Sequence, residues 1–521
     1  MIFELHFQIV DLEDDYQDLI FILKQRAVIF NLEFMDSLKN EEYIFFIRGS
    51  EKDIVKFCED LSLCLPLSLN FQFHSIRPSL IDLKDFKPEL LKNSSEVLDA
   101  VKLQMIVQKN NFKAIQKYVK QIRFQNQIVN QKSKWQESIE FCVQKILDSE
   151  IIIKTSRGNF KASVKKPEDK KEIWVLFCDL ASLKVHMRVE TKQLEVLASF
   201  EKPSTKLMSK EIFSDFLGEE CECILPYDLP LVFIAKRILE LGKNYIFLSP
   251  TQEKATFSYE QKNSSTQRVV VSKEGYILYD TQMKAKNFQE ILLAHQNLLI
   301  QEEKERLKTS SLILFLSKDN PMLFWLKREK LQSILDLEIE LNPKEVFQTI
   351  QTTSEGKRLL ENFSHTFPDL TQKVFALESQ SRRGKSFYEF LNTIGFVLGY
   401  ENADGILRNA KKYLRDKGPR IDFKLFKDEK NILRFDEVKC LKSCMSFRIA
   451  GVDPETLSYG ILDSLGEFIA NFIADMMVNF STKSIFLCGS FLIEKIFLDR
   501  ILHYTRKDID LILPQKGFLD Y

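Results

Sequence analysis

The first 75 residues alternate between strand-like and helix-like hydrophobic patterns. "MIFELHFQIV" (1–10) has strand character, and "YQDLIFILKQRA" (16–27) places apolar residues at helical spacing. Two further strand patterns, "VIFNLEFM" and "EYIFFIRG", flank the polar turn "DSLKNEE". A helical pattern, "EKDIVKFCEDLSLC", and a last strand, "LSLNFQFHSI", complete the series. The order β-α-β-β-α-β predicts a ferredoxin-like domain over residues 1–78.

Residues 79–149 change to a mainly helical pattern, which predicts a connecting segment. Within it, "QKNNFKAIQKYVKQIRFQNQIVNQKSKWQ" (108–136) holds seven basic residues and no acidic one, and we predict a basic amphipathic helix. Such a face most often meets solvent, and the stretch lacks aromatic residues spaced for base stacking. RNA binding is therefore a third-ranked hypothesis, and nucleic acid is not an expected partner.

Residues 150–267 are rich in strand patterns, among them "SEIIIKT", "EIWVLFCDL", "VHMRVET", "QLEVLASF" and "NYIFLSP". They also contain "CILPYDLPLVFIAKRILELG", which runs from a proline-bounded turn into an apolar helix that Gly242 ends. "KNSSTQ" (262–267) has the composition of a linker. This part of the chain is predicted to be a strand-rich middle domain.

The remainder, residues 268–521, combines long helical stretches with strand patterns such as "SLILFLSKD", "SIFLCGS" and "DIDLILP". Helices interspersed with strands indicate an α/β layout. The predicted fold class is therefore a multidomain α/β protein. It begins with an α+β ferredoxin-like domain, continues with the strand-rich middle domain and ends in an α/β domain.

Composition adds few constraints. A chain of 521 residues is long enough for several hydrophobic cores. The 74 basic and 74 acidic side chains cancel, so net charge gives no argument for nucleic acid or membrane. The start of the chain lacks the features of a secretory signal, and no apolar run reaches the length of a membrane helix. Nine scattered cysteines favour reduced thiols and a cytoplasmic protein.

Candidate chemistry is sparse. No two of the six histidines are three or four residues apart, the spacing by which one helix offers two imidazoles to a metal, so no metal site is expected. The close cysteine pairs, Cys221 with Cys223 and Cys440 with Cys444, are interpreted as structural thiols. We find no nucleophile elbow and no cysteine with a local histidine partner. The catalytic residues, if any, stay unassigned.

One stretch resembles part of a phosphate-binding loop. In "ESQSRRGKSF" (378–387), Gly384-Lys385-Ser386 matches the end of the pattern G-x-x-x-x-G-K-S, and "KVFAL" before it has strand character. The first glycine of that pattern is replaced by Ser379. Because such loops need glycine for their amides to wrap a phosphate, we expect no true phosphate loop here.

The last third carries an ordered set of fragments that resembles a known family. "GKSFYEFLNTIGFVLGYENADGILRNAKKYL" is followed by "YGILDSLGEFIANFIADMMVNF", "SIFLCGSFLIEKIFL" and "DIDLILP". Together they resemble the C-terminal carbamoyltransferase region of HypF, a NiFe-hydrogenase maturation protein. The resemblance implies an actin-like ATPase-type domain at 268–521, an acylphosphatase-like domain at 1–78, a helical segment at 79–149 and a faintly YrdC-like domain at 150–267.

The departures from that family bear on function. The loop after the first strand, "VDLEDDY", is acidic where acylphosphatases have glycine and arginine, and it would repel a phosphate. The chain has no CxxC pair and no clustered histidines. Tyr388 replaces the aspartate of the family's "GRLFD", Asn402 the glycine of "YEG", Ser490 the second glycine of "SGG" and Glu494 the asparagine of "FQN". Together these losses indicate a retained scaffold without its chemistry.

The resemblance implies an accessory factor for NiFe-hydrogenase assembly, such as one encoded with some bacterial uptake hydrogenases. Its expected partner is a hydrogenase subunit precursor or another maturation protein. The alternative is an active carbamoyl- or nucleotidyl-transferase with relocated ligands. No cofactor is expected, and ATP is the one that the resemblance would allow. If nucleotide binding is retained, the residues expected to carry it are Gly384, Lys385, Tyr400, Glu401, Gly489 and Ser490, with Ser386 as a further candidate.

The segment "LCGSFLIEK" raises the question of whether this part of the chain binds phosphate. A strand, a glycine turn and a helix form a corner of the kind that binds phosphate, because helix-start amides point outward there. Ser490 adds a side chain beside Gly489, and Glu494 is expected to place a carboxylate on the first helical turn. Since that charge complements the helix N-terminus and competes with phosphate, we predict a retained corner without its ligand.

Overall fold

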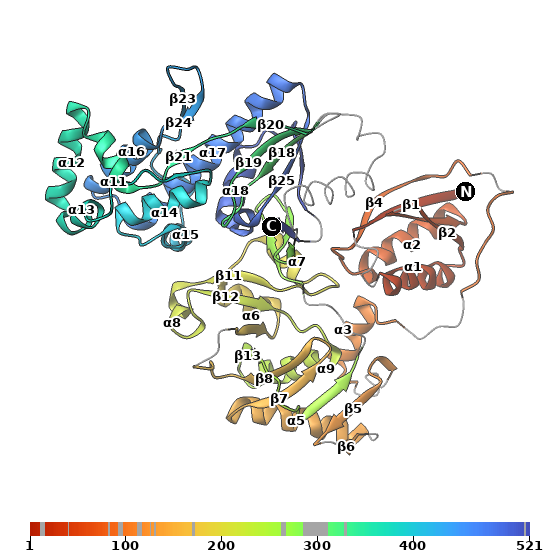
Figure 1. The fold of residues 1–521 in the computed structure, drawn as a ribbon. Helices are drawn as coiled ribbons and strands as arrows, with labels where there is room; N and C mark the ends of the chain where they lie inside the picture. The colour runs from red at the N-terminus through yellow and green to blue at the C-terminus, as the bar shows by residue number, and fades with distance from the viewer. Residues whose placement is uncertain are drawn as a thin grey trace. The chain divides into compact units, whose positions relative to one another are not determined.

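A computed structural model gives the fold in two compact units, Met1–Val269 and Val270–Tyr521 (Figure 1). The residues that it describes are 1–10, 16–39, 41–81, 84–91, 97–111, 117–125, 127–129, 132–168, 172–261, 267–284, 311–327, 331–514 and 517–520.

The first unit begins with a four-stranded antiparallel sheet in the order β2-β3-β1-β4. Its elements follow the predicted β-α-β-β-α-β series: β1 (Ile2–Ile9), α1 (Gln17–Ile29), β2 (Glu33–Lys39), β3 (Glu42–Arg48), α2 (Glu51–Cys64) and β4 (Phe71–Pro78). The predicted second strand began too early, because Leu23 and Ala27 are buried on one helical face and carry α1 through Ile29. The predicted turn 36–42 was too long, because β2 continues along β3 to Lys39.

A ten-stranded mixed sheet fills the rest of this unit, in the order β10-β11-β12-β9-β13-β8-β7-β14-β5-β6. Its strands are β5 (Gln121–Phe124), β6 (Gln127–Ile128), β7 (Ile151–Thr155), β8 (Gly158–Ser163), β9 (Trp174–Phe177), β10 (Met187–Arg188), β11 (Thr205–Ser209), β12 (Glu220–Ile224), β13 (Tyr245–Pro250) and β14 (Phe257–Glu260). Its helices are α3 (Ala100–Gln108), α5 (Lys132–Asp148), α6 (Leu180–His186), α7 (Thr191–Leu197), η1 (Glu211–Phe213), α8 (Ser214–Leu217) and α9 (Leu229–Glu240).

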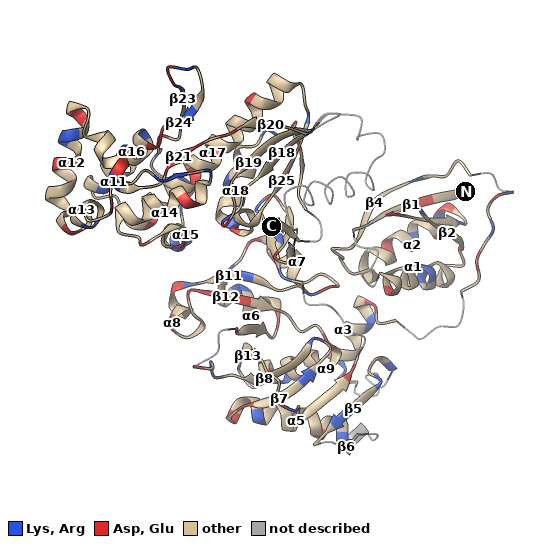
Figure 2. Ribbon diagram, viewed as in Figure 1, with Lys and Arg blue, Asp and Glu red and all other residues tan. Residues whose placement is uncertain are grey.

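Two predictions for this region were wrong. The basic helix is interrupted by β5 and β6, because Ile122 is fully buried in the sheet and pairs with Tyr259. Its basic residues therefore do not share one helical face, and both signs of charge occur across the unit (Figure 2). Residues 191–197 form α7 rather than a strand, because Gln193 closes a capping box and Val196 and Leu197 are buried.

The second unit is built on a five-stranded sheet in the order β20-β19-β18-β25-β26. The central pair, β18 and β25, is parallel, and so are β25 and β26, whereas β19 is antiparallel to its neighbours. These strands are β18 (Ser311–Phe315), β19 (Leu323–Lys327), β20 (Leu331–Leu335), β25 (Ser484–Cys488) and β26 (Asp510–Ile512).

A helical insertion separates β20 from β25 in the chain. It holds α11 (Pro343–Ile350), α12 (Ser354–Thr366), α13 (Pro368–Phe375), α14 (Phe387–Leu398), α15 (Ala403–Lys412), α16 (Glu437–Ile449) and α17 (Pro454–Phe480). Short strands within it are β21 (Ile339–Glu340), β22 (Arg383–Gly384), β23 (Leu425–Lys427) and β24 (Leu433–Phe435). The remaining elements are β15 (Val269–Val271), β16 (Ile277–Tyr279), β17 (Gln282–Lys284), η3 (Ser490–Ile493), α18 (Lys495–Tyr504) and β27 (Phe518–Asp520).

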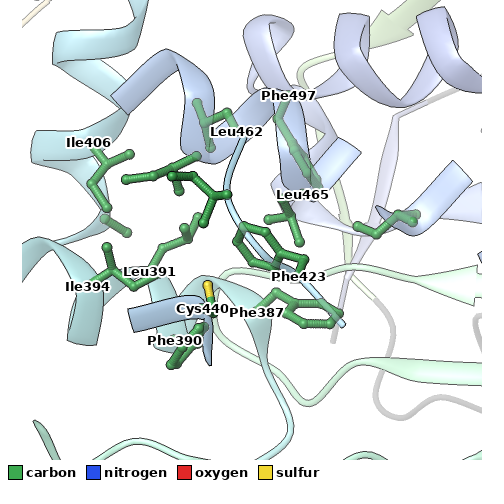
Figure 3. Packing of buried hydrophobic residues seen from close by; sticks show 14 of the residues in the cluster. Phe387, Phe390, Leu391, Ile394, Ile406, Phe423, Cys440, Leu462, Leu465 and Phe497 are labelled. Atoms are coloured by element: carbon green, nitrogen blue, oxygen red, sulfur yellow. The ribbon is translucent and has the colours of Figure 1, made fainter. Parts of the chain in front are cut away.

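The core of this unit joins the insertion to the sheet. Phe387 and Phe390 of α14 lie near Phe423 and Cys440, and Leu465 of α17 lies beside Phe497 of α18 (Figure 3). All are buried, and the same apolar cluster includes Leu314 of β18 and Leu487 of β25, so it joins the insertion to the central strands. Among the described residues, no helix combines the length and the apolar character needed to cross a membrane.

Candidate functional site

The predicted corner lies where the two central parallel strands of the second unit end. β18 ends at Phe315 and β25 at Cys488, and these two residues pair in register. The chain continues from β18 into Leu316-Ser317-Lys318 and from β25 into Gly489-Ser490. In open α/β sheets, ligands bind beyond the carboxyl ends of such strands, where neighbouring connections diverge. The strand-turn-helix-strand series predicted from "KSIFLCGSFLIEKIFL" onward is present as β25, η3, α18 and β26.

Gly489 is required at this corner by the backbone of the neighbouring loop. Its φ is +111°, and a Cβ placed on it would lie 2.2 Å from the carbonyl oxygen of Leu316. The two loops are joined by hydrogen bonds from Leu316 N to Cys488 O at 2.8 Å and from Phe491 N to Leu316 O at 3.0 Å. The glycine therefore allows a close backbone approach within the protein, whether or not a ligand binds.

The acceptor of the Ser490 amide is a carboxylate of the chain itself. Asp520 Oδ2 accepts from Ser490 N at 3.2 Å, and the Ser317 hydroxyl lies 3.0 and 2.9 Å from its two oxygens. Asn320 Nδ2 donates to Oδ1 at 2.8 Å. Asp520 is only 2% exposed, and it arrives on β27, which pairs with β17. The donors that would face a phosphate thus already hold a carboxylate.

The hydroxyl groups of the corner are engaged as well. Ser490 Oγ accepts from Lys318 N at 3.0 Å and lies 3.3 Å from Ser317 Oγ. Ser317 Oγ also accepts from the amides of Asp319 and Asn320, at 3.1 and 3.0 Å. The side chain that replaces the family's second glycine is therefore part of a closed hydrogen-bond network.

Glu494 has a different role from the one predicted. A 3-10 turn, η3, precedes α18, so Glu494 occupies the cap position of α18, and its side chain makes no capping hydrogen bond. Its carboxylate instead binds Lys318 Nζ at 2.5 Å and Lys411 Nζ at 3.3 Å. Burial acts to raise the pKa of Glu494, but Lys411 and Lys318 outweigh it and hold that pKa below its usual value. The positive charges of Lys318 and Lys411 are thus balanced by a carboxylate of the chain itself.

The local structure around Gly384-Lys385-Ser386 differs from the strand and loop that the sequence pattern predicts. Gly384 lies in β22, which pairs with β21, and "KVFAL" is mostly the end of α13 rather than a strand. Lys385 Nζ forms an ion pair with Asp336 at 2.6 Å. Ser386 caps α14 by accepting from Glu389 N at 3.3 Å.

Glu340 accepts hydrogen bonds from the residues just before this stretch. Its buried carboxylate accepts from Arg382 N at 2.9 Å and from Ser381 Oγ at 2.6 Å. Burial acts to raise the pKa of Glu340, but these hydrogen bonds and Arg383 lower it overall. The Arg382 amide, the Ser381 hydroxyl and the Arg383 side chain are therefore directed at an internal carboxylate.

Tyr400 and Glu401 lie between α14 and α15, and their described contacts lead away from the corner. The Arg448 guanidinium lies 5.4 Å from the centre of the buried Tyr400 ring. Glu401 is exposed, with a φ of +71°, and contacts Arg408 at 3.4 Å. Of the six predicted residues, the structure brings only Gly489 and Ser490 into the corner. A nucleotide-binding role for the others stays a prediction.

Sequence reasoning missed Asp520, Ser317, Asn320, Lys318 and Lys411, because no local pattern marks them. The only available signal is position, since Ser317 and Lys318 directly follow a predicted strand. All nine cysteines are free thiols. Within the described parts of the chain, no group of three or more His, Cys, Asp or Glu side chains is placed to hold a metal ion.

Comparison with known proteins places this architecture in a family. No protein-family profile matches the chain. Protein HydE of Wolinella succinogenes is 30% identical over 532 residues, which cover 96% of this chain and 95% of the relative. The chain belongs to the HydE family. This agrees with the resemblance found in the sequence, which pointed to a HypF-like protein of this accessory type.

Two solved structures share the fold of this HydE-family chain. HypF of T. kodakarensis superposes with a TM-score of 0.58 at 11% identity, covering 100% of this chain and 97% of that one. Full-length HypF in a phosphate- and nucleotide-bound form gives a TM-score of 0.56 at 10% identity, covering 99% and 96%. At such identities the likeness establishes the fold alone. It confirms a mixed α/β, multisheet architecture like that of HypF.

Proposed function

We propose that this HydE-family protein is an accessory factor for NiFe-hydrogenase maturation that lacks carbamoyltransferase activity. It acts by binding a hydrogenase subunit precursor or another maturation protein. Family membership and the HypF fold support the pathway, and the closed corner supports the absence of catalysis. Because one fold hosts many functions, the argument about activity depends on the site itself.

The finer domain assignment belongs to the same proposal. The antiparallel sheet of residues 1–78 is consistent with an acylphosphatase-like domain, and the mixed sheet of the second unit with an actin-like domain over 268–521. Residues 79–149 are assigned as a connecting segment, although they contain β5 and β6. Residues 150–267 are assigned as a YrdC-like domain.

The observation that carries the proposal is that internal carboxylates occupy the corner. A bound phosphate would have to replace Asp520 on the Ser490 amide. It would also lie close to Glu494, which already neutralises Lys318. Catalysis by charge stabilisation needs donors that are aimed at the reacting group, and losing one such donor costs about a hundredfold or more in rate. In this corner, several donors already bind carboxylates of the chain itself.

The first experiment is calorimetric titration of the full chain with ATP, with and without Mg²⁺. We expect no binding in the micromolar range. Micromolar binding that weakens in Lys318→Ala would overturn the proposal and favour the alternative, a carbamoyl- or nucleotidyl-transferase with an altered site. The observation that keeps this alternative is that two lysines, Lys318 and Lys411, remain at the corner. Arg506→Ala, which removes an exposed cation, is the matched control.

The second experiment is affinity purification of the tagged full chain from its native cell. Hydrogenase subunits or hydrogenase maturation proteins should be enriched over a tag-only control. Their absence from repeated purifications made while hydrogenase is being synthesised would contradict the partner assignment. This outcome is independent of the ATP titration, so the two halves of the proposal are tested separately.

A further inference from the structure

We propose that β4 pairs with β4 of a second copy of this chain, so that two four-stranded sheets join through their edges. β4 is an eight-residue edge strand that offers outward backbone groups and exposed apolar side chains at the same positions. The pairing is independent of the proposed function, because it concerns a second copy of the chain and not a hydrogenase protein.

The two edges of this sheet differ in their protection. At the β2 edge, Glu89 N donates to Phe34 O at 2.8 Å, and the Glu89 side chain accepts from Asp36 N at 3.4 Å. β4 follows β1 at the opposite edge, and no described strand pairs with its outer side (Figure 1). The ten-stranded sheet ends in β10 and β6, which have two residues each. Proteins commonly protect edges by covering or shortening them, and β4 has neither protection.

The backbone groups of Phe73 and Ile76 face outward from the sheet. Ser79 N donates to the first residue of β1 at 2.9 Å, and Asn70 O accepts from the residue after β1 at 2.9 Å. Inward and outward groups alternate along an antiparallel pair. Counting from residue 79, residues 77 and 75 bond to β1 and Ile76 faces outward. Counting from residue 70, residue 72 bonds to β1 and Phe73 faces outward.

The side chains of Phe73 and Ile76 also share one face of the sheet. They lie opposite Phe7 and Leu5, which both belong to the core cluster that includes residues of α1 and α2. A register shift between His6 and Phe7 adds one residue to β4, so that two residues three apart point to the same face. Phe73 is 56% exposed and Ile76 43%, so a second copy can cover both side chains.

β4 is complementary to itself in one antiparallel register. When Phe73 lies opposite Ile76 of a second copy, a two-fold axis repeats the same pair on the other side. The outward backbone groups of the two strands then meet, and the exposed apolar side chains form cross-strand pairs on one face. In this register Arg77 lies opposite Gln72, so the guanidinium groups of the two copies do not oppose each other directly. A second copy is therefore the occupant that this edge fits.

A single pair of edge strands is a small interface. Stable protein interfaces bury about 800 Å² on each partner, and two paired edge strands bury less. We therefore expect a reversible dimer with a dissociation constant of about 1–100 μM, in equilibrium with single chains.

The test is sedimentation velocity of the full chain at concentrations from about 1 to 200 μM. The average mass should rise from that of one copy toward that of two over this range. Phe73→Lys should raise the dissociation constant about tenfold or more, because the two-fold axis makes one substitution change two cross-strand pairs. Val55→Lys is the matched control, because Val55 is 51% exposed and lies on α2, away from the sheet edge.

A double variant tests the register. In Phe73→Lys/Ile76→Asp, the introduced lysine of one copy lies opposite the introduced aspartate of the other. Because opposite charges attract across paired strands, this double variant should dimerise more tightly than either single variant. A double variant that dimerises more weakly than both single variants would overturn the proposed register.

Two other results would overturn the pairing itself. One is an unaltered chain that stays a single copy at every concentration, which would leave β4 to a different protein. The other is a dimer that Phe73→Lys weakens no more than Val55→Lys does. Circular dichroism checks that each variant folds, and Ile76→Ser replaces Phe73→Lys if that variant does not. None of these results bears on the ATP titration or on the purification of hydrogenase proteins.

Discussion

Replacing Gly489 by alanine tests whether protein packing, rather than a ligand, explains the glycine. The new Cβ would meet three backbone atoms of Leu316, its oxygen at 2.2 Å, its carbonyl carbon at 2.5 Å and its nitrogen at 2.9 Å. Backbone atoms at the end of a central strand cannot rotate away as a side chain does. The residue would also be held at φ +111° and ψ 156°, a region that only glycine adopts readily.

The two effects can be given magnitudes. A non-glycine residue in that backbone region costs about 1–3 kcal/mol, and overpacking a tight contact costs about 1–3 kcal/mol more. We therefore expect Gly489→Ala to lower the free energy of unfolding of the second unit by about 4 kcal/mol. Gly451→Ala is the matched control, because Gly451 has a φ of +80° but nothing within 4 Å of its added Cβ. Its expected cost is about 1–2 kcal/mol.

The assay is urea unfolding monitored by tryptophan fluorescence. The chain has three tryptophans, so a Trp135→Phe/Trp174→Phe background leaves Trp325 of β19 as the sole reporter for the second unit. Both glycine variants and their parent are compared in that background. Equal losses of stability for Gly489→Ala and Gly451→Ala would refute the close approach of Leu316 as the reason for the glycine.

Two further predictions concern pH. Glu494→Gln leaves Lys318 and Lys411 without their shared carboxylate and should cost about 1–3 kcal/mol at pH 7. Because folding lowers the pKa of Glu494, this carboxylate stabilises the folded protein above the usual glutamate pKa, and the stabilisation is lost as pH falls. The denaturant midpoints of the unaltered protein and Glu494→Gln should therefore converge in acid. A difference between the two midpoints that does not change with pH would contradict this. In the first unit, burial lowers the pKa of Lys202 to about 8, and its Nζ donates to Ala198 O at 2.6 Å. Between pH 8 and the usual pKa of lysine, the unfolded chain binds more protons than the folded protein. The free energy of unfolding should therefore rise with pH relative to that of Lys202→Met. If the denaturant midpoints of the two proteins change with pH in the same way, the pKa of Lys202 is not lowered.

Local patterning accounts for much of the observed fold. The β-α-β-β-α-β series of the first sheet and the strand, turn, helix and strand around Gly489 follow from hydrophobic periodicity and turn residues. The predictions from hydrophobic pattern were wrong where burial in the tertiary structure favoured another element. Residues 121–128 fall within the stretch predicted as a basic helix, yet Ile122 pairs with Tyr259 across the sheet. Residues 193–197 fall within a predicted strand, yet the capping box and buried face of residues 191–197 favour a helix.

The sequence alone determined that a glycine corner exists, because a strand, a glycine and a helix are close together along the chain. Only the tertiary structure decided what fills that corner. Asp520 lies 30 residues from Ser490 and 203 residues from Ser317, and no local pattern relates them. Lys411 likewise reaches Glu494 from α15. Hydrogen bonds and ion pairs of this kind depend on which elements the core brings together, so they arise from packing and not from neighbouring residues.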